Sequence, residues 1–149
     1  RIVKSVIDAN QYHVYKYTWD LIRDLKKKKY YILAISHSPR ELVYRFCRKL
    51  GFNKVYGRVY EFDSQEKFTG NVLYVDEIND KAKILKRAIE KEKLTLHNSV
   101  GVGDTESDIA FLSWVDRPIC FNPNKKLYDH AKKEKWQIVV ERKDVVYSL

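Results

Sequence analysis

The chain has 149 residues, of which 44% are hydrophobic and 33% are charged, and its formal net charge is +9. This length and composition are typical of one globular domain and exclude a disordered chain. No apolar run approaches the roughly 20 residues of a membrane-spanning helix, so we also exclude a transmembrane protein.

The chain begins with Arg1 and contains no methionine. We therefore expect it to be a processed form or a piece of a longer protein. Residues 1–15 have a helical pattern, but they precede the alternation that organises the rest of the chain.

Helical and strand-like segments alternate from residue 18 onward. The spacing of apolar residues predicts helices over 17–29, 38–50, 80–94, 107–115 and 125–134. Short apolar runs predict strands over 30–36, 98–103, 118–121 and 136–140, and residues 55–75 predict a hairpin. We expect Gly51 to terminate the second of these helices. The pattern indicates one α/β domain with a mostly parallel sheet covered by helices on both faces.

The two cysteines, Cys47 and Cys120, stand in apolar stretches without a metal-ligand spacing. We expect buried, reduced thiols rather than a disulfide, which places the protein in the cytoplasm.

Ligands of α/β sheets collect at the carboxyl ends of strands, and two such corners carry unusual residues. At the first corner, Ser36 ends a strand, and Ser38 to Glu41 fit a capping box with Pro39 at the first helical position. Capping explains Ser38 but not Ser36. The Ser36 hydroxyl, with the backbone N–H groups of His37 and Ser38, would form a small anion site. We interpret His37 as a backbone donor only.

The second corner reads "VGVGDTESDI", and it gathers three carboxylates within five residues. Thr105 to Asp108 fit a capping box, whereas Asp104 has no such explanation. We expect Asp104 to end a buried strand, where an unpaired carboxylate is costly. A hard cation such as Mg²⁺ would offset that cost. Glu106 is expected to face solvent.

Lys81 falls on the core-facing stripe of its helix, three and four residues before Ile84 and Leu85. It also lies in the first turn, where a cation opposes the helix dipole. Lys83 points away from that stripe. The Ser36 hydroxyl, the Lys81 ammonium and an Mg²⁺ held by carboxylates together indicate a phosphate site.

The segments "LAISHSP", "NDKAKIL" and "VGVGDTESDIAFL" resemble motifs II, III and IV of haloacid dehalogenase superfamily phosphatases, and the phosphoserine-phosphatase-like branch is the most similar. The resemblance covers residues 18–149 in order. It implies a three-layer Rossmann-like core over 18–149, incomplete at its start, and a remnant of a helical cap over 1–17.

The resemblance also implies residue roles. Ser36 would hydrogen-bond the transferring phosphoryl group, and Lys81 would neutralise its charge. Asp104 would bind Mg²⁺ directly, and Asp108 would act through water or by orienting Lys81. Ser107 stands where relatives often carry Asn in contact with the substrate. The implied reaction is Mg²⁺-dependent hydrolysis of a small phosphorylated substrate through an aspartyl-phosphate.

The sequence departs from the family at its nucleophile. That group belongs to a DxDx(T/V) motif on an upstream strand, and this chain contains no Asp-x-Asp. We therefore expect the chain to be the C-terminal part of a phosphatase and to be inactive as given.

Two alternatives stay open, namely a phosphate- or RNA-binding module and a fused parent protein. The first rests on the positive charge, including Lys26 to Lys29 and a lysine cluster over 125–135. Solvated helix faces and helix ends explain the same lysines. Substrate identity and oligomeric state stay open as well.

Overall fold

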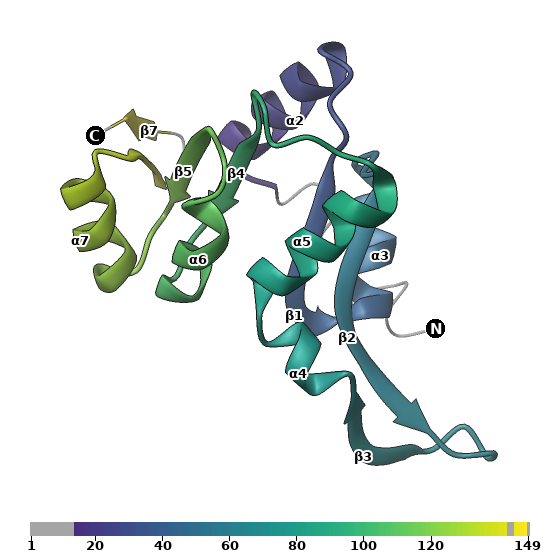
Figure 1. The fold of residues 1–149 in the computed structure, drawn as a ribbon. Helices are drawn as coiled ribbons and strands as arrows, with labels where there is room; N and C mark the ends of the chain where they lie inside the picture. Colours follow the sequence, from purple (N-terminus) through teal and green to yellow (C-terminus); the bar gives the residue numbers. More distant parts are fainter. Residues whose placement is uncertain (1–13, 143–144, 149) are drawn as a thin grey trace. The chain divides into compact units, whose positions relative to one another are not determined.

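The computed structural model describes residues 14–142 and 145–148, and these divide into two compact units (Figure 1). The first unit comprises Val14 and Thr18–Asp80. The second comprises Tyr15–Tyr17 and the described chain from Lys81 onward. Each unit is described separately below.

The first unit contains a three-stranded sheet in the order β1-β2-β3. Its elements in chain order are α2 (Lys16–Lys27), β1 (Leu33–Pro39), α3 (Arg40–Lys49), β2 (Lys54–Phe62), β3 (Phe68–Leu73) and α4 (Val75–Ile78). Strands β1 and β2 run parallel, whereas β2 and β3 form the predicted antiparallel hairpin. The first two residues of α2 belong to the second unit.

Helix α3 packs on β1 and β2 at close range. A Cβ atom added to Gly57 of β2 would lie 2.6 Å from the Cα of Arg40, so only glycine permits this approach. At the other end of α3, Gly51 adopts a φ of +79°, and its N–H donates to the carbonyl of Arg48 (3.0 Å). The predicted glycine terminator is therefore confirmed. Ile22, Ile32 and Leu50 form the buried core of this unit.

The second unit contains a four-stranded sheet in the order β4-β5-β6-β7. Its elements are α5 (Lys81–Glu92), β4 (Val100–Gly103), the 3₁₀ turn η1 (Glu106–Asp108), α6 (Ile109–Leu112), β5 (Arg117–Phe121), α7 (Lys125–Glu134), β6 (Gln137–Arg142) and β7 (Val145–Ser148). Strands β4, β5 and β6 are parallel, and β7 pairs antiparallel with β6.

The two faces of strand β5 have different neighbours. Cys120 belongs to a buried cluster that the helices α6 and α7 and the strand β6 complete, with Leu112, Leu127, Ala131 and Ile138. Phe121, the next residue, points to the opposite face because side chains alternate along a strand. Its ring lies 5.1 Å from that of Tyr15 and 5.6 Å from that of Tyr17.

Glu141 of β6 is a buried carboxylate in the same unit. It accepts hydrogen bonds from the backbone N–H groups of Lys16 and Tyr17, both at 2.8 Å. These N–H groups open α2 and have no acceptor within the helix. The carboxylate therefore provides the acceptors for the first two N–H groups of α2, and its negative charge interacts favourably with the positive end of the helix dipole.

The α/β class and most predicted elements are confirmed, with four differences. The described strands form two sheets, whereas the sequence pattern predicted one. Strand β1 continues through Pro39 and α3 begins at Arg40, so the capping box predicted from Ser38 to Glu41 is wrong. Glu41 instead accepts from Arg45 one turn later (2.6 Å). The predicted helix over 107–115 is shortened to η1 and α6, and neither β7 nor α4 was predicted. The helical pattern of residues 1–15 lies almost wholly outside the described residues.

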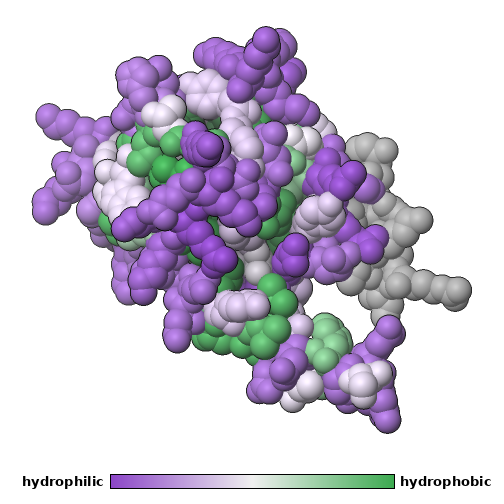
Figure 2. Space-filling model, turned by 45° about the vertical axis from the view of Figure 1, so that its right-hand side comes forward, coloured by the Kyte–Doolittle hydropathy of each residue, from purple (hydrophilic) through white to green (hydrophobic). Residues whose placement is uncertain are grey.

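Both cysteines are free and buried, as predicted. Burial raises the pKa of each thiol to about 11, with the charge of Asp108 contributing at Cys120. No helix in the described part of the chain is long and apolar enough to cross a membrane. Hydrophilic side chains cover most of the face shown in Figure 2, with smaller hydrophobic patches between them.

Candidate active site

The candidate site is built on the loop that follows β4 in the second unit. Gly103 is the last residue of β4, and a Cβ atom placed there would lie 2.5 Å from the Cβ and 2.8 Å from the Oδ2 of Asp108. Glycine therefore lets the Asp108 carboxylate approach the backbone at the end of the strand. This close approach explains why glycine precedes Asp104.

Asp108 is the buried carboxylate of the site, with 1% of its surface exposed. Its Oδ2 accepts hydrogen bonds from the backbone N–H groups of Asp104 (2.8 Å) and Thr105 (3.2 Å), so the predicted Thr105–Asp108 capping box is confirmed. Its Oδ1 pairs with the Nζ of Lys81, whose side chain is 13% exposed. Both oxygens of Asp108 are thus engaged inside the protein.

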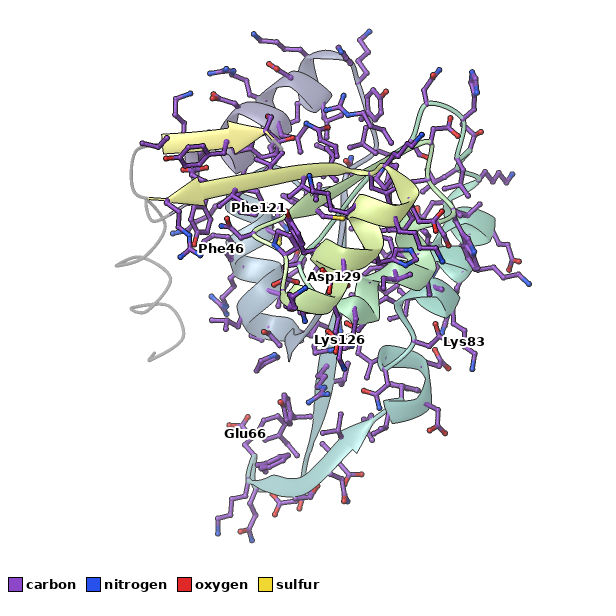
Figure 3. The ribbon with its side chains drawn as sticks, turned by 90° about the vertical axis from the view of Figure 1, so that its left-hand side faces the viewer. Phe46, Glu66, Lys83, Phe121, Lys126 and Asp129 are labelled. Carbon is purple, nitrogen blue, oxygen red and sulfur yellow. The ribbon has the colours of Figure 1, made fainter. Side chains whose placement is uncertain are left out.

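Lys81 begins α5 and points inward, as its position on the apolar stripe predicts. Lys83 is exposed, also as predicted (Figure 3). The burial of Lys81 is tolerated because Asp108 supplies an opposite charge at contact distance. The two residues therefore form one ion pair beneath the loop.

Asp104 differs from its expected environment. The residue is exposed rather than buried, because β4 ends at Gly103 and Asp104 begins the loop. Its carboxyl group is still partly withdrawn from water. This desolvation and the negative charge of Asp108 raise the pKa of Asp104, while Lys81 opposes the shift. The prediction that Asp104 is the costly buried carboxylate is wrong, since Asp108 has that position.

The different environments of Asp104 and Asp108 indicate which of the two carboxylates can bind a cation directly. Asp104 presents its carboxylate oxygens to solvent, and such oxygens are the protein ligands that a hard divalent ion prefers. Both oxygens of Asp108 already accept from Lys81 or from backbone N–H groups, so Asp108 fits the role of orienting Lys81 better than that of a direct ligand. No group of three or more His, Cys, Asp or Glu residues within 14–142 and 145–148 is arranged to hold a metal. Of the two carboxylates, Asp104 is the one that fits as a direct ligand.

The remaining predicted residues lie in two places. In the second unit, the hydroxyl of Ser107 is 2.8 Å from that of Thr105. In the first unit, Ser36 accepts at its Oγ from the N–H of Ser38 (3.1 Å), so the prediction that this N–H is free for an anion is wrong. The Nε2 of His37 is buried without a hydrogen-bond partner among the described residues. The structure brings Lys81, Asp104, Ser107 and Asp108 into one loop region, and the participation of Ser36, His37 and Ser38 stays a prediction.

Sequence reasoning missed Asn124, which joins the site loop to α7. Its backbone N–H donates to the carbonyl of Asp104 (2.8 Å), and its side-chain amide donates to Glu106. Glu106 also pairs with Lys126 (3.2 Å). The amide and Lys126 lower the pKa of Glu106 to about 2. The only signal in the sequence was that Asn is a favourable residue before a helix.

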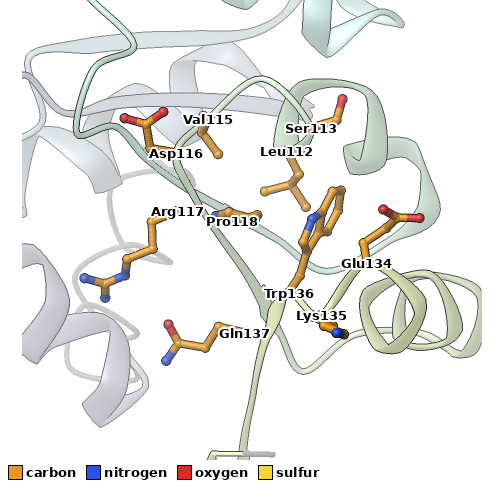
Figure 4. A pocket seen from close by; sticks show the side chains of 10 residues that line it. All are labelled: Leu112, Ser113, Val115, Asp116, Arg117, Pro118, Glu134, Lys135, Trp136 and Gln137. Carbon is orange, nitrogen blue, oxygen red and sulfur yellow. The ribbon is translucent and has the colours of Figure 1, made fainter.

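A separate pocket of about 540 Å³ opens in the second unit where β5 and β6 begin (Figure 4). Arg117, Trp136 and Gln137 contribute to its lining. None of the predicted site residues lines it. Because Asp104 follows the carboxyl end of β4, this pocket lies at the opposite end of the parallel strands.

Comparisons with known proteins agree with the motifs of this loop. A phosphoserine phosphatase of Archaeoglobus fulgidus is 26% identical over 113 residues, which cover 75% of this chain and 33% of that protein. Phosphoserine phosphatase SerB1 of Mycobacterium tuberculosis is 28% identical over 127 residues, which cover 80% of this chain and 40% of that protein. The chain therefore spans less than half the length of these two relatives.

Solved structures extend the similarity to the fold. A phosphoserine phosphatase in its apo form is 28% identical with a TM-score of 0.67, covering 84% of this chain and 60% of that one. A phosphoserine phosphohydrolase-like protein from Francisella tularensis has a TM-score of 0.73 at 16% identity, covers 94% of this chain and 64% of that one, and supports the fold alone. A model of the haloacid dehalogenase-like hydrolase family matches residues 1–113. The chain belongs to the haloacid dehalogenase-like hydrolase family.

Proposed function

We propose that the protein from which this chain derives is a Mg²⁺-dependent phosphomonoester hydrolase that acts through an aspartyl-phosphate. The observation that carries the proposal is the buried Lys81–Asp108 pair beneath the exposed Asp104. A buried cation next to an exposed carboxylate suits a site that must hold a phosphoryl group and a divalent ion together.

Each residue of this chain has a defined part in the proposal. Asp108 fixes the position and charge of Lys81, whose ammonium offsets the negative charge of the phosphoryl group during transfer. Asp104 holds Mg²⁺, which would stabilise developing charge on the phosphoryl oxygens. Ser36 donates its hydroxyl to a phosphoryl oxygen. Ser107 and the backbone N–H group of His37 are the remaining candidates for contact with the substrate.

The nucleophile is assigned to a segment outside this sequence. The family's reaction needs an aspartate that accepts the phosphoryl group and then releases it to water, and this chain has no Asp-x-Asp motif. Strands β1 and β4 each form one edge of their sheets in the described structure. An edge strand presents backbone N–H and C=O groups to a further strand, so each of these edges can accept a strand of the kind that carries the motif. The chain alone is therefore proposed to be inactive.

We propose a small phosphorylated molecule as the substrate. The relatives include phosphoserine phosphatases and a histidinol-phosphatase of Neisseria meningitidis. Phosphoserine, another phosphorylated amine or alcohol, and a nucleotide are the classes to screen.

The test is hydrolysis of an aryl phosphate by the full-length protein, with Mg²⁺ and with a chelator. We expect turnover that requires Mg²⁺ and that Asp104→Ala abolishes. Asp129→Asn is the matched control, because Asp129 forms a surface ion pair with Lys125 on α7 (Figure 3). Full activity of Asp104→Ala would refute the role of Asp104, and an inactive wild-type protein would refute the hydrolase.

A second candidate is a phosphate- or RNA-binding module, which the net charge of +9 favours. Two lysines of the cluster are already paired within the protein, Lys125 with Asp129 (2.6 Å) and Lys126 with Glu106 (3.2 Å). Lys26 and Lys27 close α2, where cations favour the helix dipole. A salt-sensitive gel shift with bulk RNA would support the module, and no binding at low salt would dispose of it.

A further inference from the structure

Asn124 has more contacts to the candidate site than any role in helix capping requires. Its Oδ1 accepts from the N–H of Leu127 (3.0 Å), which is ordinary N-capping of α7. Its backbone N–H donates to the carbonyl of Asp104 (2.8 Å). Its Nδ2 donates to Glu106 in the middle of the same loop. The side chain of Asn124 thus connects the start of a ten-residue helix to Glu106, and its backbone holds a second point of the loop.

These contacts complement those of Asp108. Asp108 fixes the loop from inside, through the N–H groups of Asp104 and Thr105. Asn124 fixes it from outside, through the carbonyl of Asp104 and the carboxylate of Glu106. The peptide units on both sides of the Asp104 Cα are therefore held, which leaves the Asp104 side chain as the free part of the residue.

Glu106 and Lys126 extend this network. The second oxygen of Glu106 is 3.2 Å from the Nζ of Lys126, on the first turn of α7. Glu106 is therefore held at both oxygens by groups at the start of α7, which connects the loop to that helix. The side chain of Glu106 is 42% exposed, so its charge-assisted hydrogen bond to Asn124 is the contact that a mutation can remove without creating a cavity.

We propose that Asn124 is a positioning residue, which orients the metal-binding carboxylate of Asp104 by fixing the loop to the N-terminus of α7 through Glu106. The inference rests on the proposed function, because it takes Asp104 as the ligand of a divalent cation. Neighbours of metal ligands commonly set affinity in this way, and their mutation typically costs about 10-fold to 100-fold in metal binding.

The experiment separates the cap of α7 from the contact to the loop. In Asn124→Ser the hydroxyl still caps α7 but is too short to reach Glu106. Glu106→Gln keeps an acceptor for Asn124 while removing the charge, and Glu106→Ala removes both. Lys125→Gln, on the same helix turn, is the matched control. The readouts, both on the full-length protein, are the Kd for Mn²⁺, from the electron paramagnetic resonance signal of free Mn²⁺, and the Tm without metal.

We expect Asn124→Ser and Glu106→Ala each to weaken Mn²⁺ binding by about 10-fold. The double variant should bind Mn²⁺ as tightly as either single variant, because both substitutions remove the same hydrogen bond. Glu106→Gln and Lys125→Gln should bind Mn²⁺ like the wild type, and Asn124→Ser should melt close to it. Three results would each overturn the positioning role. They are wild-type Mn²⁺ affinity in Asn124→Ser, additive losses of affinity in the double variant, and a loss of affinity in Glu106→Gln equal to that in Glu106→Ala. Failure of the wild type to bind Mn²⁺, or equal binding by Asp104→Ala, would instead overturn the proposed function.

Discussion

Replacing Gly103 by alanine is the most direct test of how the site loop is built. The new Cβ would lie 2.5 Å from the Cβ and 2.9 Å from the Cγ of Asp108. Carbon atoms in contact prefer separations of about 3.5–4.0 Å, so one of the two residues must move by about 1 Å or more. Asp108 is held by its own short helical turn, and its displacement would stretch the hydrogen bonds to Asp104 and Thr105.

The cost can be worked out from these contacts. Hydrogen bonds to a charged group contribute about 1.5–3 kcal/mol each, and overpacking alone costs about 1–3 kcal/mol. Removing the conformational freedom of glycine returns about 0.4–1 kcal/mol. Even if only one hydrogen bond is lost, we expect Gly103→Ala to lower the free energy of unfolding by about 2–4 kcal/mol.

Gly101→Ala in the same strand is the matched control. Its Cβ would meet the side-chain atoms Cγ2 of Val115 (3.0 Å) and Cδ2 of Leu112 (3.1 Å), which can give way. We expect a change in unfolding free energy within about 1 kcal/mol. Urea unfolding followed by tryptophan fluorescence measures both variants. Equal stabilities of the two variants would refute the claim that the close approach of Asp108 to Gly103 organises the loop.

Three further predictions concern buried groups. Lys81→Met should lower the unfolding free energy by about 3 kcal/mol, because it leaves the Asp108 carboxylate buried without its cation. Urea unfolding measures this change, and a loss below about 1 kcal/mol would contradict the prediction. Burial raises the pKa of Cys47 from 9.0 to about 11, so iodoacetamide should label it far more slowly at pH 8 in the native than in the unfolded protein, and equal rates would count against its burial. Since the folded pKa exceeds the unfolded one, the contribution of Cys47 to stability is present below pH 9 and declines between pH 9 and pH 11. Glu141→Gln should cost about 1–3 kcal/mol, because an amide can replace only one of the two acceptor oxygens at the start of α2, whereas exposed Glu134→Gln should unfold like the wild type.

The local sequence pattern was sufficient to predict the environment of residues that depends on a single helix or strand. The apolar stripe of α5 predicted that Lys81 points inward, and the glycine after an amphipathic segment predicted the end of α3 at Gly51. The motif order predicted the family and the α/β class. The apolar stripe repeats at the helical period, and the glycine and the motifs are short contiguous patterns, so a single sequence reveals them.

Features that depend on contacts between distant segments were not predictable. The hydrogen bonds of Asn124 connect α7 to a loop some twenty residues earlier, and the sequence shows only a residue suited to a cap. The capping box predicted at Ser38 was wrong because β1 extends three residues beyond Ser36, the predicted end of the strand. Strand β7 was missed for another reason: it pairs with the strand just before it, but its four residues show no alternation of apolar and polar side chains.

The division of work between Asp104 and Asp108 leads to a final prediction about stability. Asp108 stabilises the fold because its oxygens accept from two backbone N–H groups and pair with Lys81. Asp104 has the opposite effect on stability, because desolvation and the nearby charge of Asp108 raise its pKa. A carboxyl group whose pKa is raised by folding is destabilising at neutral pH, where it is ionised.

We therefore expect Asp104→Asn to leave the Tm at pH 7 unchanged or raise it, while abolishing Mn²⁺ binding, and Asp108→Asn to lower the Tm. Below the ordinary pKa of an aspartate, near pH 4, the gain in Asp104→Asn should disappear, because the wild-type residue is then neutral as well. Thermal unfolding of the two isosteric variants at both pH values measures this difference. If Asp104→Asn lost as much stability as Asp108→Asn, Asp104 would be a structural carboxylate. The proposal that Asp104 serves function at a cost in stability would then be wrong.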